Sequence, residues 1–354
     1  MKRYLTLSLF GVFLISCNQS PQTVTGLPES EIIAIDSSEV TNDFYDNTET
    51  FSLPLPEITV GGEISNPGKV DFTSLSRHSV IVKETLLDPD GGDRFVGAYR
   101  YDGYSLFDIL KNIKVQKSNS EEFNSVIDLF VEIENAAGEK AVFSWGEIYY
   151  PNNLHKILIA DRVSRIVPSK TNDLWALPAE GKIVAGSDLI TERNISSPVR
   201  ITIRSFPKSF TVAQGMSPMF SKQIALFESG SPAGTIAGYP AGMHETTFNT
   251  IFYGRGKGIH STEPFSGVML KDVLSSHFTG DRNNLRSGIM CIAAEDGYRC
   301  TASFSEIFNR NDQQELLLIK TKPGEDGGLF RIFPACDFFS DRAIKSVKEI
   351  HLGF

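Results

Sequence analysis

The chain has 354 residues, of which 41% are hydrophobic and 22% charged, so it can form one large domain or two smaller ones. Its formal net charge of -9 argues against a nucleic-acid partner, because contact with the phosphate backbone requires a basic face. Beyond the N-terminal segment, no apolar run approaches the length of a membrane-spanning helix.

The N-terminus has the features of a bacterial lipoprotein signal. A cationic start precedes an apolar run at Leu5–Ile15, which is too short to span a bilayer comfortably. The run ends in Leu-Ile-Ser-Cys, which resembles a lipobox, so we expect residues 1–17 to be a signal peptide and Cys17 to carry lipid. This predicts a lipoprotein of the cell envelope, periplasmic or surface-exposed, whose membrane partner is reached through Cys17. Residues 18–54 are polar and aperiodic, which predicts a flexible tether.

The expected secondary structure consists of short strands and a few short helices. In the first part of the chain we expect strands at Glu57–Val60 and Ser79–Val82, a helix at Leu106–Leu110, hairpin strands around Gly138 and a closing strand at Val199–Ile203. In the second part we expect a helix at Leu270–Leu274, hairpin strands around Gly297 and a closing strand at Val347–Leu352. The predicted fold class is therefore α+β and β-rich.

Internal similarity divides this pattern into two copies. Three pairs of segments match in the same order: Tyr101–Leu110 with Phe265–Leu274, Phe130–Ile148 with Cys291–Ile307, and Asp188–Ile195 with Asp337–Ile344. We therefore predict two tandem copies of one fold, at 55–205 and 206–354. Both copies keep an aspartate five residues ahead of an arginine, Arg193 or Arg342, which favours a structural ion pair over a catalytic role.

Three segments resemble the oxidoreductase molybdopterin-binding domain, which is the catalytic fold of sulfite oxidases and plant-type nitrate reductases. The segments are Gly61–Leu75, Phe95–Leu110 and Asp188–Ile203. The resemblance implies two tandem degenerate copies of a sulfite-oxidase-like fold. It also implies that molybdopterin is a possible cofactor, although the residues themselves leave the cofactor unknown.

The chain departs from that family at the metal ligand. The family ligates molybdenum through a cysteine thiolate, a soft ligand suited to this metal. The corresponding segments, Val82–Leu87 and Ile251–Gly258, contain no cysteine. We therefore expect the usual metal chemistry to be lost, and we assign no catalytic and no metal-ligating residue.

The cysteines other than Cys17 leave two alternatives open. They are Cys291, Cys300 and Cys336, an odd number, so an export compartment would leave one thiol over. If a hairpin turns at Asp296-Gly297, Cys291 and Cys300 become diagonal neighbours on one face, near the upper distance limit for a disulfide. Otherwise the two are small buried hydrophobes in a strand pair.

A glycine-rich stretch in the second copy is the candidate ligand site. Gly254, Arg255, Gly256, Lys257 and His260 combine backbone N–H groups that can converge on an anion with basic side chains. We expect these five residues to bind an anionic small molecule or cofactor. The alternative is a Gly-rich hairpin with solvated basic residues.

A metal site near this stretch is a weaker hypothesis. His244, Glu245 and His260 could bind a transition metal, but their spacing fits no known pattern.

Three functions follow from these observations. The first is an envelope lipoprotein that acts in ligand binding or assembly and lacks the usual metal-ligating cysteine; its protein partners are unknown. The second is a molybdopterin-dependent oxidoreductase with unusual ligation, through one of the remaining cysteines or another group. The third is a substrate-binding lipoprotein, which would need a deep cleft between two domains.

Overall fold

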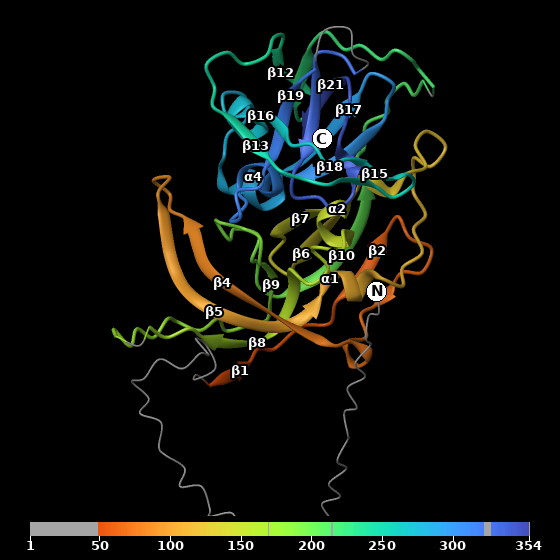
Figure 1. The fold of residues 1–354 in the computed structure, drawn as a ribbon. Helices are drawn as coiled ribbons and strands as arrows, with labels where there is room; N and C mark the ends of the chain where they lie inside the picture. The colour runs from red at the N-terminus through yellow and green to blue at the C-terminus, as the bar shows by residue number, and fades with distance from the viewer. Residues whose placement is uncertain (1–48, 169, 214, 322–326, 354) are drawn as a thin grey trace, which may run out of the picture. The chain divides into compact units, whose positions relative to one another are not determined.

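The computed structural model describes residues 49–168, 170–213, 215–321 and 327–353 (Figure 1). The predicted signal peptide, Cys17 and most of the predicted tether lie outside the described residues. All described residues belong to one compact unit, Asp43–Phe354. No helix within the described ranges is long and apolar enough to cross a membrane.

Residues 49–205, here called the first half, form two sheets. One has the order β1-β8-β5-β4, with β9 paired to β8, and the other has the order β3-β2-β10-β6-β7. The strands are β1 Thr50–Ser52, β2 Thr59–Gly62, β3 Gly68–Lys69, β4 Arg77–Leu87, β5 Asp93–Ser105, β6 Leu129–Asn135, β7 Lys140–Ser144, β8 Ile157–Arg165, β9 Lys182–Ala185 and β10 Pro198–Ser205. The helices are η1 Phe72–Ser74, α1 Leu106–Leu110, η2 Val126–Asp128 and α2 Trp145–Tyr149.

Residues from Phe206 onward, the second half, form two further sheets and a two-stranded ribbon. The orders are β12-β11-β21-β17-β18, β13-β16-β19-β20 and β14-β15. The strands are β11 Ile224–Glu228, β12 Ser231–Ile236, β13 Glu245–Phe248, β14 Phe252–Gly254, β15 Gly258–Ser261, β16 Phe265–Met269, β17 Ile289–Ala294, β18 Arg299–Ser303, β19 Leu316–Lys320, β20 Phe330–Pro334 and β21 Val347–Leu352. The helices are α3 Leu270–Leu274, α4 Arg282–Ser287, α5 Phe304–Phe308 and η3 Ser340–Arg342.

The two halves share a strand order. The sheet β3-β2-β10-β6-β7 corresponds strand for strand to β12-β11-β21-β17-β18. In both, the central strand is parallel to one neighbour and antiparallel to the other. The order β4-β5-β8-β9 likewise corresponds to β13-β16-β19-β20. This agreement is what a duplicated chain would produce, while the limits 55–205 and 206–354 stay a prediction.

The sulfite-oxidase-like α+β fold predicted from the sequence is wrong. The structure is β-rich, with a four-bladed, β-propeller-like arrangement of sheets and only short helices (Figure 1). The segments behind the resemblance are short. They specify a strand, a turn or one helical turn, whereas the packing of sheets depends on contacts between distant segments.

Individual elements were predicted more successfully than the fold. Both expected helices, Leu106–Leu110 and Leu270–Leu274, have the predicted bounds. In the first, the Ser105 hydroxyl caps the helix by accepting from the Asp108 N–H, and leucines four residues apart are buried. The expected hairpins turn at Gly138 and Gly297, whose positive φ angles of 81° and 82° suit glycine.

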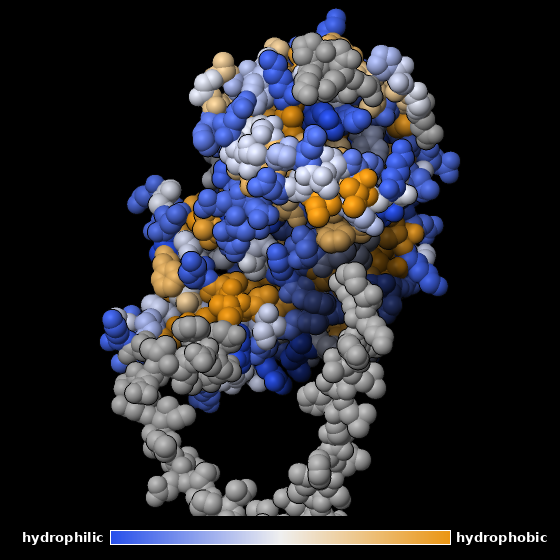
Figure 2. All heavy atoms as spheres, viewed as in Figure 1, coloured by the Kyte–Doolittle hydropathy of each residue, from blue (hydrophilic) through white to orange (hydrophobic). Residues whose placement is uncertain are grey.

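Two large apolar clusters stabilise the fold. One lies within the first half, around Leu106, Phe143 and Ile201. The other fills the second half and also contains Phe123 and Tyr150 of the first. The second cluster therefore ties the halves together. Polar residues cover most of the face seen in Figure 2, with apolar ones gathered in separate patches.

A buried group of charges, here called the junction cluster, lies where the halves meet. Its members are Glu147, Asp188, Arg193, Glu306, Asp337 and Arg342. Arg193 pairs with Asp188 and Glu147, both at 2.5 Å, and donates to the hydroxyl of Ser303 in the other half at 3.1 Å.

The second arginine repeats this arrangement. Arg342 pairs with Asp337 at 2.5 Å and Glu306 at 2.7 Å, and donates to the hydroxyl of Ser144 in the first half at 3.0 Å. Both arginines are 1% exposed. The predicted pairing of each arginine with its preceding aspartate is therefore confirmed, and each arginine also bonds across the junction.

The cysteines are free, so the predicted disulfide alternative is wrong. In the β17–β18 hairpin, Cys291 faces Thr301 and Cys300 faces Ile292. This register differs by one residue from the one that would make the cysteines diagonal neighbours, so they lie on opposite faces of the sheet. Both are fully buried, and the alternative of two small buried hydrophobes is confirmed.

Candidate functional site: a basic pocket and a histidine site

The predicted glycine-rich stretch forms the ribbon β14–β15. Gly254 pairs with Gly258, and Gly258 closes the turn with a φ of +71°. Gly254 is buried, and a Cβ there would lie 2.2 Å from Nε2 of His260. Gly254 thus allows the His260 ring to lie directly against the backbone, while Gly256 is exposed in the turn.

A cavity of about 540 Å³ lies beside this ribbon. The residues that line it, here called the basic pocket, are Phe252, Lys257, His260, Ser261, Phe265, Arg331, Ser340, Ala343 and Lys345. Four of the nine carry or can carry positive charge, and they come from β15, β20, the ribbon turn and the segment before β21. Because like charges repel, such a group favours an anion between its members.

Aromatic rings form one wall of the basic pocket. Phe252 and Phe265 meet edge to face at 5.3 Å between ring centroids, and Phe265 stacks on Phe333 at 4.2 Å. The His260 ring lies 5.3 Å from that of Phe252. The pocket therefore offers apolar ring surface from Phe252 and Phe265 next to cationic groups.

Arg255 does not line the pocket. Its Nε lies 3.0 Å from Oδ2 of Asp341, and its terminal nitrogen donates to Oδ1 at 3.2 Å. This hydrogen-bonded carboxylate raises the pKa of Arg255. Arg255 thus fastens the ribbon to η3, and of the five residues predicted from the sequence only Lys257 and His260 face the cavity.

The metal hypothesis for His244, Glu245 and His260 finds no support in the geometry. Within the described ranges, one group of His, Cys, Asp and Glu side chains is close enough to share an ion, and it consists of His78, Asp108 and His155. We call it the histidine site.

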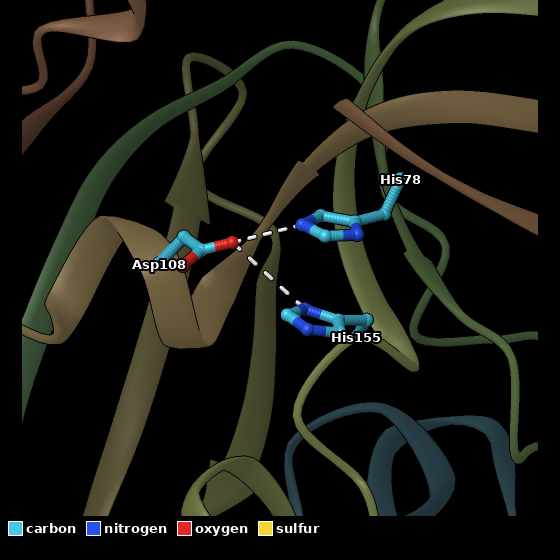
Figure 3. Close-up of side chains that lie close together, drawn as sticks. All are labelled: His78, Asp108 and His155. Atoms are coloured by element: carbon cyan, nitrogen blue, oxygen red, sulfur yellow. Dashed lines mark hydrogen bonds and ion pairs between the residues drawn. The ribbon is translucent and has the colours of Figure 1, made fainter. Parts of the chain in front are cut away.

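Three elements of the first half build the histidine site (Figure 3). His78 comes from β4, Asp108 from α1, and His155 from the loop before β8. Nε2 of His78 lies 2.9 Å from Oδ2 of Asp108, and Nδ1 of His155 lies 3.8 Å from the same oxygen. The two imidazole rings stack with centroids 3.7 Å apart.

The charges of the site follow from these contacts. Burial raises the pKa of Asp108, but hydrogen bonds from Ser105, Lys111 and His78 outweigh it and hold that pKa below its ordinary value. Partial burial and the neighbouring His78 lower the pKa of His155. The arrangement is a carboxylate whose pKa lies below its ordinary value, facing two imidazoles, and the pKa of His155 is also lowered.

Sequence reasoning missed both histidines. Asp108 stood out because the repeat contains Asp272 at the matching position, but the histidines lie far from it in the chain and fit no spacing pattern. Only the pairing of β4 with β5, and of β5 with β8, brings the three together.

Comparison with known proteins adds no identification. No model of a protein family matches the chain, and neither does the sequence of any curated protein. The residues of the two sites therefore carry the functional argument.

The remaining thiols do not favour a redox role. Cys291, Cys300 and Cys336 are buried, and burial raises the pKa of all three. None of them lines the basic pocket. Ligation of a metal through a cysteine therefore has no support in this geometry.

Proposed function

We propose that the protein binds a small anionic ligand in the basic pocket. The observation that carries this proposal is the convergence of Lys257, His260, Arg331 and Lys345 on one cavity. Lys257, His260 and Lys345 are exposed, so each charged contact contributes about 0.2–1 kcal/mol, and specific binding needs several of them together.

The aromatic wall narrows the ligand class. Phe252 and Phe265 present apolar ring surface beside the cations, and rings stack favourably on such surfaces. A ligand with a phosphate or carboxylate joined to a planar ring fits this combination better than a bare anion.

The envelope location remains part of the proposal. A lipid on Cys17 would anchor the protein, and a polar segment before the folded unit would let the basic pocket reach a soluble ligand. All nine residues of the pocket belong to the second half, so binding would need no cleft between domains.

Calorimetry tests the proposal with adenosine monophosphate and inorganic phosphate as probes of the full-length chain in detergent. We expect adenosine monophosphate to bind more tightly than phosphate. We expect Lys257→Ala/Lys345→Ala to weaken its binding by about 2- to 30-fold, because two exposed charged contacts are lost. The matched control, Lys69→Ala/Lys114→Ala, removes the same charge from exposed positions of the first half.

Two results would contradict the proposal. One is the absence of binding by both probes. The other is an equal loss of affinity in the pocket variant and the control, because the change in net charge alone would then explain the weaker binding.

A further inference from the structure

We propose that His78, Asp108 and His155 form a binding site for a zinc ion in the first half. Two imidazole nitrogens and a carboxylate oxygen are a ligand set that Zn²⁺ commonly takes from proteins, with water in the remaining position. The proposal is independent of the basic pocket, because the two sites share no residue.

A shared ion requires the ligand atoms to shift and the two imidazole rings, now stacked within 9° of parallel, to tilt until both nitrogen lone pairs point at it. Zinc lies about 2.0–2.2 Å from N and O ligands, so tetrahedral ligand atoms are about 3.3–3.5 Å apart. The His78–Asp108 contact of 2.9 Å has to open slightly, and the His155–Asp108 separation of 3.8 Å has to close slightly. All three ligand atoms already lie within 4.8 Å of one another.

Neighbouring side chains hold the carboxylate in place. The Ser105 hydroxyl donates a hydrogen bond to Oδ2 of Asp108 at 2.9 Å, and the same hydroxyl accepts one from the Asp108 N–H. Lys111 donates to Oδ1 at 3.2 Å. Such outer contacts orient metal-binding carboxylates. Ser105 occupies one lone pair of Oδ2, and the other is on the side of His78.

The site is open on one side. The side chain of His155 is 45% exposed and that of His78 26% exposed, so water can reach the two rings. Asp108 also lines a separate cavity of about 250 Å³. An ion held here would keep at least one exchangeable position, as in zinc sites that act on a substrate.

The fold itself does not require the two histidines. His78 pairs with Gly103 across β4–β5, and Thr246 pairs with the equivalent Gly267 across β13–β16. His155 lies two residues ahead of β8, and Gln314 lies two residues ahead of the equivalent β19.

The second half thus retains only the carboxylate of this ligand set, as Asp272 in α3. A scaffold built twice, with two imidazoles added to one copy beside the shared carboxylate, indicates a ligand set specific to that copy.

Zinc titration of the full-length, untagged chain in detergent tests the proposal, with calorimetry and metal analysis as readouts. We expect one Zn²⁺ per chain. We expect His78→Thr/His155→Gln, which installs the residues of the second half, to weaken binding by well over about tenfold, since even outer-contact losses cost about 10–100-fold.

Matched variants separate a metal site from a structural contact. Asp108→Asn should weaken zinc binding, whereas Asp272→Asn and His260→Gln should leave it unchanged. Circular dichroism and thermal unfolding establish that each variant is folded.

Zinc binding that survives in His78→Thr/His155→Gln, or that Asp272→Asn weakens equally, would overturn the proposal. So would the absence of stoichiometric zinc binding by the folded wild-type chain. The adenosine monophosphate titration is unaffected by either result, so failure of the zinc site and failure of the basic pocket are distinguishable.

Discussion

The junction cluster and the two solvent-facing sites relate differently to the internal symmetry. In the junction cluster, each half supplies an arginine, an aspartate and a glutamate, and each arginine donates to a serine of the other half. Among the residues that the structure describes, the histidine site is built from the first half and the basic pocket from the second. What the halves share holds them together, and the two proposed ligand sites consist of residues that they do not share.

Burial explains why the shared part is constrained. Charged groups away from water must keep every partner, because an unpaired buried charge costs several kcal/mol. Partly exposed positions such as Thr246 and His78 carry no comparable penalty, so the two copies can differ there.

The largest expected effect comes from Arg193→Met. The substitution leaves Asp188 and Glu147 buried without their cation, which should lower the free energy of unfolding by about 3–5 kcal/mol. Chemical denaturation measures it, with Arg255→Met as control. Arg255 is 54% exposed, so loss of its pair should cost no more than about 1 kcal/mol. If both variants lost a similar amount of unfolding free energy, buried and exposed ion pairs would not differ in this protein as we expect.

A second test uses the pH dependence of the junction cluster. Four carboxylates face two guanidinium groups there, and burial, with Glu306 nearby, raises the pKa of Glu147 from 4.5 to about 7 despite Arg193. A raised pKa means that the folded state holds the proton more tightly. The stabilisation from Glu147 is therefore complete below about pH 4.5 and lost as the pH rises through about 7.

Glu147→Gln should flatten this dependence. Between about pH 5 and pH 8 the wild type should lose on the order of 2 kcal/mol through this group, and the variant should lose less. Burial also raises the pKa of Asp188 and Asp337, so some slope will remain. The measurement is the free energy of unfolding of both proteins across this pH range. The same slope against pH in the wild type and in Glu147→Gln would contradict the argument.

The smallest effect on stability is expected from Gly254→Ala. The new Cβ would displace the His260 ring, whose Nε2 would otherwise lie 2.2 Å away. A ring at the end of a side chain can move, so we expect less than about 1 kcal/mol of destabilisation but several-fold weaker binding of adenosine monophosphate. Gly256→Ala is the control, since no atom lies near the Cβ it adds. Equal affinities in the two variants would remove His260 from the proposed pocket.

Local structure was predictable wherever neighbouring residues decide it. The helices at Leu106–Leu110 and Leu270–Leu274 follow from apolar residues at helical spacing, and the hairpin at Gly297 follows from a residue that accepts positive φ. The Asp188–Arg193 pair was also predictable, because both residues recur at one spacing in each copy.

Register and side-chain convergence were not predictable in this way. A shift of one residue in the β17–β18 hairpin placed Cys291 and Cys300 on opposite faces, and no local signal distinguishes the two registers. Arg255 belonged to a plausible anion-binding motif, but its guanidinium group forms an ion pair with Asp341, which lies far along the chain.

The sequence by itself determined the short elements, their order and the doubling of that order, because these depend on spacing and backbone preference along a few residues. Only the tertiary structure decided how the four sheets pack. It alone brought His78 and His155 next to Asp108 in one half. In the other half it brought Arg331 and Lys345 next to Lys257. Those meetings depend on strand pairing between distant segments, where the free energy comes from apolar surface buried by the whole unit.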